Sequence, residues 1–409
     1  MRVLSGLDPL FLADVDTWKV ALIVAIKVLV AFAGLMVSVM LMIWWERKFI
    51  SDMQNRIGPN RAGPFGILQT LADGIKLFFK EDLIPDQADR FVFKLAPYLS
   101  LVPAFLVFSV VPIAGDFSDG GDGTVSWFGV ETFVQVADPH MGILFVLAMS
   151  SVAVYGIMLA GWSSGSKYPL LGSVRASAQM VSYEAALGLA LVAVLLQSGS
   201  LSTHEIALGQ TGGFDNWNLL ATGIVPFIVF FIATTAELNR PPFDLVEAEQ
   251  EIVGGFHTEY SSIRFALFFL AEFMNVITMS AVMVTLFFGG PAGPDLGILP
   301  AAVWGFVWFF LKLFAFLCTF IWLRGTLPRL RYDQLMDLGW KILIPLALGW
   351  VMLLATIDVF VDRGWDSFGE RLVVVGVSLV VMALLASLLF AGVRSGQRRR
   401  QLDGEEAFG

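Results

Sequence analysis

The chain alternates between long apolar stretches and shorter charged segments along almost its whole length. A helix that crosses a bilayer needs roughly 20 consecutive, mostly apolar residues. Nine stretches meet this requirement, at about 20–44, 94–113, 141–162, 176–197, 218–236, 264–289, 300–323, 341–361 and 371–393. The pattern therefore predicts an all-α polytopic membrane protein with about nine transmembrane helices.

The positions of lysine and arginine predict the orientation of these helices. If the segment after the first stretch is cytoplasmic, twenty of the 26 Lys and Arg residues fall on that side and four on the other. Cytoplasmic loops of membrane proteins are enriched in these residues. We therefore expect the N-terminus outside and the C-terminus in the cytoplasm, which requires an odd number of spans.

The composition agrees with a membrane protein and narrows its chemistry. Of the 409 residues, 57% are hydrophobic and 15% are charged, whereas typical soluble domains carry about 25% charged residues. The single cysteine, Cys318, cannot supply a disulfide framework or the ligands of an iron–sulfur cluster. The three histidines are far apart in sequence, so no metal site is predicted. No nucleotide-binding glycine motif and no basic aromatic patch for nucleic acid is present.

The segment 46–90 is longer than a simple connector between two spans. Within it, residues 65–79 place apolar side chains at a spacing close to 3.6, which predicts an amphipathic helix on the cytoplasmic side. Asp73 and Lys76 are three residues apart, so they can pair on one side of this helix. The alternative interpretation is a lipid-surface helix without a ligand.

The segment 237–263 carries six carboxylates against a single base, Arg240. The acids are Glu237, Asp244, Glu247, Glu249, Glu251 and Glu259. Carboxylates this close together repel one another, so we expect some to retain protons near neutral pH and the set to titrate together. A solvated acidic loop would be the simpler interpretation. The interleaved apolar residues Phe243, Leu245, Val246, Ile252, Val253 and Phe256 favour a packed loop instead.

Four ionisable residues lie inside predicted spans, where an exposed charge is costly. Such residues mark functional sites by default. Glu184 has no basic neighbour in its apolar run, and we expect it to carry protons, while Glu272 lies between Ala271 and Phe273. For Lys27, a structural role, as snorkelling towards the membrane surface or an ion pair, and a functional role are equally compatible with the sequence, whereas for Lys312 the structural role is favoured.

Two of these segments resemble a known family. The motifs are ERKFISDMQNRIGPNRAGPFGILQTLADGIKLFFKE and AELNRPPFDLVEAEQEIVGGFHTEYSSIRFALFFLAEFMN. They resemble the signature regions of the H-type membrane subunit of NADH-quinone oxidoreductase, respiratory complex I, whose mitochondrial counterpart is NADH dehydrogenase subunit 1. The resemblance extends from about residue 18 to 345. It implies a domain of eight transmembrane helices over 1–361. The region 362–409, which the apolar pattern and charges predict to be an extra transmembrane helix and a basic cytoplasmic tail, matches the family more weakly.

The resemblance also implies roles for individual residues. It implies a proton or charge relay that couples quinone reduction to proton translocation, made of Glu184, Glu237, Asp244, Glu247, Glu249, Glu251, Glu259 and Glu272. It implies a quinone-access chamber that this chain lines or borders with Arg47, Arg56, Asp73, Lys76 and Phe269.

The same resemblance implies the setting of the chain. We expect a subunit without independent activity, in a multi-pass position in the bacterial plasma (inner) membrane. Its expected partners are the other membrane and hydrophilic subunits of complex I, quinone and membrane lipid, but no nucleic acid. It is expected to bind no cofactor alone, with quinone as substrate and with flavin and iron–sulfur clusters on partner subunits.

Three alternative functions follow from the same residues. The equivalent subunit of a related complex with another electron donor, such as reduced cofactor F420 or ferredoxin, would look the same in this chain. A stand-alone ion transporter would use the acidic segment as an ion site, but it predicts an inverted repeat that the sequence does not show. A purely structural membrane anchor would leave Glu184 and the packed acidic segment unexplained.

Overall fold

A computed structural model describes residues 8–11, 16–118, 120–245, 252–294 and 300–361, together with scattered positions between 369 and 387. The longer helices are α1 (Thr17–Met53), α2 (Gln69–Phe78), α3 (Arg90–Phe108), α4 (Gly142–Ser163), α5 (Lys167–Ser198), α8 (Ile224–Glu237), α10 (Ser262–Phe287), α11 (Ala301–Thr326) and α13 (Ile344–Val361). The shorter elements are η1 (Pro9–Phe11), η2 (Pro64–Gly66), β1 (Thr124–Trp127), β2 (Val130–Phe133), α6 (Thr203–Leu208), η3 (Phe214–Asn216), α7 (Asn218–Ala221), η4 (Gly255–His257), α12 (Tyr332–Asp337) and the π-helical η5 (Leu338–Leu343).

The described helices agree with an all-α polytopic membrane protein. Seven of them are long and apolar enough to cross a membrane, and the last of these runs continuously over Tyr332–Thr356. The fifth predicted span, 218–236, is divided into α7 and the shorter apolar helix α8. The break falls at Gly223, whose φ of 80° is readily adopted only by glycine. The ninth predicted span, at 371–393, lies largely outside the described residues, as does most of the predicted unit 362–409.

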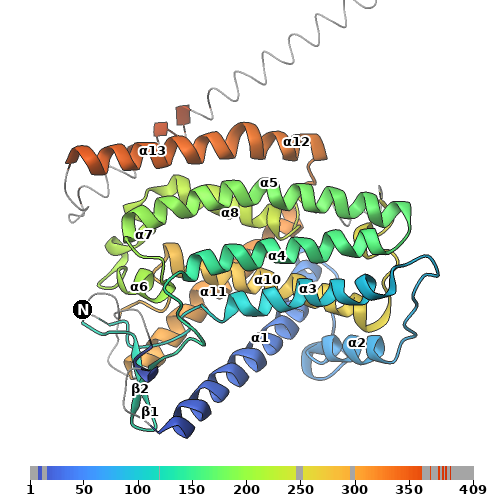
Figure 1. Ribbon diagram of the computed structural model, residues 1–409, viewed down its shortest axis with the longest axis horizontal. Coiled ribbons are helices and arrows are strands. Elements are labelled where there is room, and N and C mark those ends of the chain that lie inside the picture. Colours follow the sequence, from blue (N-terminus) through green and yellow to red (C-terminus); the bar gives the residue numbers. More distant parts are fainter. Residues whose placement is uncertain are drawn as a thin grey trace, which may run out of the picture.

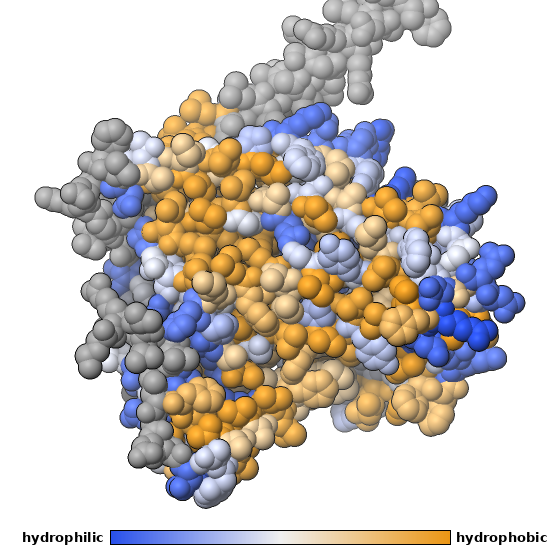
Figure 2. All heavy atoms as spheres, in the orientation of Figure 1, coloured by the Kyte–Doolittle hydropathy of each residue, from blue (hydrophilic) through white to orange (hydrophobic). Residues whose placement is uncertain are grey.

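The long helices lie side by side, with their ends gathered at two opposite faces (Figure 1). The end that carries β1, β2, α6 and α7 is called the hairpin end here. The opposite end, which carries α2 and residues 252–261, is called the acidic end. Figure 2 shows a broad hydrophobic surface across the helices, with hydrophilic residues gathered at the acidic end. This distribution is typical of a protein whose sides contact lipid.

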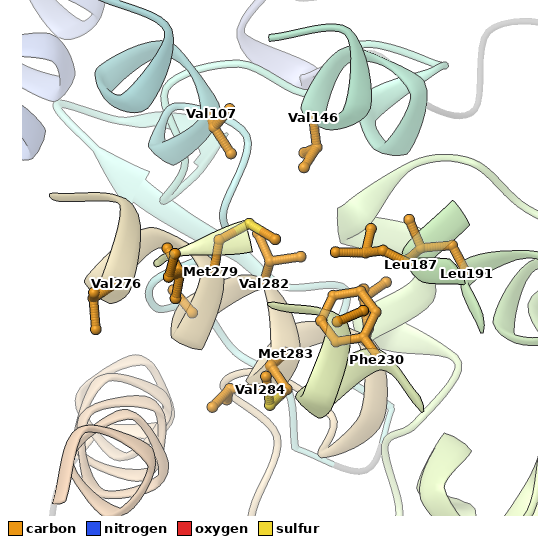
Figure 3. Packing of buried hydrophobic residues seen from close by; sticks show 14 of the residues in the cluster. Val107, Val146, Leu187, Leu191, Phe230, Val276, Met279, Val282, Met283 and Val284 are labelled. Carbon is orange, nitrogen blue, oxygen red and sulfur yellow. The ribbon is translucent and has the colours of Figure 1, made fainter. Parts of the chain in front are cut away.

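Helix α10 forms the centre of the bundle. Of the seven long apolar helices it is the most buried, and its residues from Phe273 to Phe287 are almost all buried. Figure 3 shows Met279, Val282 and Met283 of α10 close to Leu187 of α5 and Phe230 of α8. Because α10 is apolar on all sides over this length, it is suited to a central position rather than to the lipid boundary.

The amphipathic helix is shorter than the predicted range 65–79. Helix α2 begins only at Gln69, because η2 precedes it and Phe65 adopts a left-handed φ of 54°. The apolar residues of α2, including Leu71, Ile75 and Phe78, are exposed in this chain. Its position in the plane of a membrane interface stays a prediction.

At the hairpin end, a buried ion pair attaches the N-terminal segment to the bundle. Strands β1 and β2 pair antiparallel around a turn at Phe128 and Gly129, both with positive φ. Lys27 of α1 donates to Asp8 and to Thr132 of β2, each at 2.6 Å. The structural interpretation of Lys27, as a member of an ion pair, is therefore the one that the contacts support.

Candidate functional site

Two carboxylates near the middle of the bundle are each held by a serine of α4. Glu184 lies near the midpoint of α5, and Glu237 is the last residue of α8. Ser151 donates a hydrogen bond to Glu184, and the preceding residue, Ser150, donates one to Glu237. Consecutive residues of a helix point about 100° apart, so the two hydroxyls reach two different helices. Helix α4 thus connects two of the predicted relay residues.

A buried arginine organises the carboxylates nearer the acidic end. The Arg240 guanidinium lies 3.2 Å from both carboxylate oxygens of Glu46 in α1 and 3.1 Å from Glu272 in α10. The same guanidinium lies over the ring of Phe273, 4.3 Å from its centroid. Arg324 of α11 also pairs with Glu46. These ion pairs join three helices to the segment after α8, and they give the intramembrane Glu272 a basic partner from outside its own helix.

The acidic segment is packed where the structure describes it. Phe243, Leu245, Ile252 and Phe256 are buried, as predicted, whereas Val253 is exposed and has a φ of 64°. Val246 and the predicted relay residues Glu247, Glu249 and Glu251 lie outside the described residues.

Contacts from other parts of the chain hold the start of this segment. Asp244 pairs with Arg329 at 2.7 Å, so the acids do not face Arg240 alone. The amide of Gln179 in α5 donates to the carbonyls of Ala236 and Phe243, at 2.8 and 3.0 Å, and lies 3.1 Å from the side-chain oxygen of Asn239. Of the other predicted residues, Glu259 is partly buried.

A small cavity opens beside these carboxylates. It has a volume of about 60 Å³, and its lining includes Glu237, Glu272, His257, Phe269 and Asn275. Ligand pockets usually measure about 300–1,000 Å³, so this cavity alone is too small for a quinone with its tail. Burial lowers the pKa of His257 to about 4. The imidazole is therefore neutral at physiological pH, and the ionisable acids set the charge of the cavity.

The predicted quinone-binding residues separate into two groups. Phe269 lines the cavity, next to Phe273 at a ring-centroid distance of 4.8 Å. The other four lie outside the cavity lining. Arg47 pairs with Asp73 at 2.6 Å and so joins α1 to α2, whereas Arg56 and Lys76 are exposed. Among the described residues, Asp73 therefore pairs with Arg47 and not with Lys76, because the arginine of the packed helix α1 reaches it.

Several residues of this site were not predicted from the sequence. They are Glu46, Ser150, Ser151, Arg324 and Arg329, which take part in the ion pairs and hydrogen bonds of the site, and Gln179, which bonds to the backbone next to Glu237 and Asp244. The signal for Glu46 was its position beside Arg47, just after the first predicted span. A serine in an apolar helix has no comparable signal, because it often bonds only to its own backbone.

Comparisons with known proteins identify the family. Residues 26–355 match the model of the family described as NADH dehydrogenase. The chain belongs to this family. A relative from Frankia casuarinae, named as the H subunit of NADH-quinone oxidoreductase, is 50% identical over 97% of this chain and 84% of its own length. Proteins of the same name from Frankia alni and Streptomyces avermitilis are 48% and 47% identical, over 94% and 91% of this chain and 82% and 80% of their own lengths.

This family assignment confirms the resemblance seen in the two motifs. The chain is a multi-pass membrane component of complex I type, and other complex I subunits are its partners. Nothing in the relatives' names favours the alternative electron donors.

Proposed function

We propose that this chain forms one wall of a quinone-access chamber and carries the carboxylate relay that couples quinone reduction to proton translocation. The complex would be an NADH-quinone oxidoreductase of the bacterial plasma (inner) membrane, with the N-terminus of this chain outside. The observation that carries the proposal is that Glu237 both lines the cavity and shares helix α4, through consecutive serines, with Glu184.

The small size of the cavity supports a shared chamber. At about 60 Å³ it can admit only part of a quinone, so neighbouring subunits would complete the site. The exposed apolar residues of α2, with Arg47 and Asp73 at its junction with α1, would border the entrance. Arg56 and Lys76 would lie at the same border. Flavin and iron–sulfur clusters would belong to partner subunits, and quinone would be the substrate.

The charge pattern suggests how the relay would work. Quinone reduction consumes two electrons and two protons, so it changes the charge of the chamber. Glu272 and Glu237 line the cavity and would feel this change directly, while Arg240 joins Glu272 to the acidic segment, in which Asp244 pairs with Arg329. Glu184 would receive the perturbation next, through α4. Glu247, Glu249, Glu251 and Glu259 remain proposed members of the same relay.

The replacement Glu184→Gln tests this function in the assembled complex. Quinone-linked NADH oxidation and proton pumping should fall at least tenfold, on the order expected for removal of a proton-transfer group. NADH oxidation by an artificial hydrophilic acceptor should stay normal, because that reaction does not involve this chain. Glu131→Gln, at an exposed position of β2, is the matched control. Normal quinone-linked activity and pumping in Glu184→Gln would refute the proposal.

A further inference from the structure

The carboxylates of this site fall into two classes according to their partners. Glu46, Glu272 and Asp244 each pair with at least one arginine. Glu184 and Glu237 are instead held by the hydroxyls of Ser151 and Ser150. Within the described part of the chain, no Lys or Arg side chain lies within ion-pair distance of either of these two.

The two kinds of partner differ in what they can bind. A guanidinium has only N–H donors and a fixed positive charge, so it favours the ionised carboxylate and cannot accept a hydrogen bond from the O–H of a carboxylic acid. A serine hydroxyl has one donor and two lone pairs. It can donate to the ionised carboxylate and accept from the protonated one, so neither form leaves a buried group unpaired.

When Glu184 becomes protonated, the hydroxyl proton of Ser151 needs another acceptor, and one lies close to it. The Ser151 Oγ lies 3.1 Å from the carbonyl oxygen of Leu147, one turn earlier in α4, as well as against Glu184. The hydroxyl proton can therefore point to Glu184 when that residue is ionised. It can point to the Leu147 carbonyl when Glu184 is protonated and donates its own proton to Oγ.

The surroundings of Glu237 also allow two protonation states. Ser150 contacts one carboxylate oxygen, and the other is buried without a hydrogen-bond partner among the described residues. A second cavity of about 20 Å³, lined by Ser150, Glu237, Asn275 and Thr278, lies beside it. The hydroxyl of Thr278 is likewise buried and unpartnered among the described residues. A cavity of this volume accommodates one water molecule, and these groups would supply its polar contacts.

We infer that Ser150 and Ser151 are positioning residues that make Glu237 and Glu184 the proton-exchanging members of the relay, whereas the arginine-paired carboxylates act as fixed charges. In each exchange, one proton is bound or released at the carboxylate and the serine hydroxyl only reorients, so the serine gains and loses no proton. This inference rests on the proposed function and makes it more specific.

Replacing each serine in the assembled complex tests the inference. Ser150→Ala and Ser151→Ala should each lower quinone-linked activity roughly tenfold, because both protonation states of the carboxylate lose the hydroxyl that serves them. Activity with the artificial acceptor should be unchanged. Ser150→Thr and Ser151→Thr retain the hydroxyl and should restore most of the activity. Ser280→Ala is the matched control, since this buried serine of α10 bonds, among the described residues, only to the Val276 carbonyl of its own helix.

A spectroscopic measurement separates positioning from packing. Infrared difference spectra taken upon quinone reduction should contain a carboxylic acid band that Glu184→Gln removes. Ser151→Ala should shift this band, because the hydrogen bond to the acid changes, and Ser280→Ala should leave it in place.

The possible outcomes distinguish this inference from the proposed function. If Glu184→Gln is inactive but Ser150→Ala and Ser151→Ala behave as the unchanged protein, the inference is wrong and the relay stands. If Glu184→Gln is itself fully active, the proposed function fails. Should the alanine variants not assemble, Ser150→Cys and Ser151→Cys keep the side-chain volume with a weaker donor, and full activity in both would overturn the inference.

Discussion

The two ends of the bundle bury polar groups in opposite ways. At the hairpin end, Lys27 contacts Asp8 and Thr132, and Lys312 of α11 donates to three backbone carbonyls. Each cation there is matched to its acceptors by short hydrogen bonds. At the acidic end and towards the middle, carboxylates outnumber their arginine partners and several border a cavity.

This difference distinguishes buried charged groups that stabilise the fold from buried carboxylates that can take part in function. A buried charge with a complete set of partners fixes the backbone around it and has no reason to change its protonation. A buried carboxylate beside a cavity, held by a hydroxyl, can change its protonation without disrupting the fold. The two ends of the molecule should therefore respond differently to substitution, and the following predictions test that contrast.

The largest effect on stability is expected from Lys27→Met. The change leaves Asp8 buried without its cation, which typically costs about 3–5 kcal/mol of the free energy of unfolding. Thermal unfolding of the purified complex should occur at a clearly lower temperature, while quinone-linked activity per folded complex stays normal. The double variant Asp8→Asn, Lys27→Met should recover much of the loss. Equal stability of the single and double variants would contradict a structural ion pair.

A somewhat smaller loss is expected from Lys312→Met. The ammonium donates to the carbonyls of Phe288, Gly290 and Ala292 at 2.7, 3.0 and 2.6 Å, just beyond the end of α10. Removing it leaves these carbonyls unpaired, at an expected cost of about 2–3 kcal/mol. Thermal unfolding again measures the effect, with the charge-preserving Lys312→Arg as the control. An unchanged unfolding temperature in Lys312→Met would show that the carbonyls find other donors.

At the acidic end, His257 should make stability fall in acid. Its pKa is lowered to about 4 by burial, against 6.5 for an unperturbed histidine. Between these values the unfolded chain binds more protons, so stability should be complete above pH 6.5 and decrease as the pH falls towards 4. In His257→Gln, the unfolding temperature measured from pH 7 to 4 should depend less steeply on pH than in the unchanged protein. The exposed His140→Gln is the control, and an identical slope in both variants would count against the assignment.

At the hairpin end, Asp138 should have the opposite and smallest effect. Burial raises its pKa to about 6 from 3.8, although Ser202 donates to both carboxylate oxygens. Stability from this group should therefore rise as the pH falls from 6 towards 3.8, because the folded state holds the proton more tightly. Asp138→Asn should remove this dependence and raise stability near pH 7.5. If Asp138→Asn were less stable than the unchanged protein near pH 7.5, this prediction would be refuted.

The hydrophobic pattern predicted the helices well, because a membrane span is specified by length and apolarity alone. The break at Gly223 was missed, since one glycine within an apolar run does not reveal a positive φ. Helix α2 was predicted too long for a related reason, as the left-handed Phe65 has no sequence signature.

The site was predicted less completely than the fold. Acidic residues in apolar surroundings stand out in a sequence, so Glu184 and Glu272 were identified directly. Their partners depend on how helices distant in sequence pack together. Arg324 approaches Glu46, Arg329 approaches Asp244, and neither pair is adjacent in sequence. The pairing predicted from local spacing, between Asp73 and Lys76, was the one that tertiary packing replaced.

The three contacts of Gln179 have a consequence for motion within the membrane. One amide fastens the middle of α5 to the last turn of α8 and to the Phe243 carbonyl beyond it. Segments joined in this way open together in amide hydrogen exchange. The backbone around Glu184 and the backbone around Glu237 should therefore exchange as one cooperative unit, so that whatever loosens one exposes the other at the same rate.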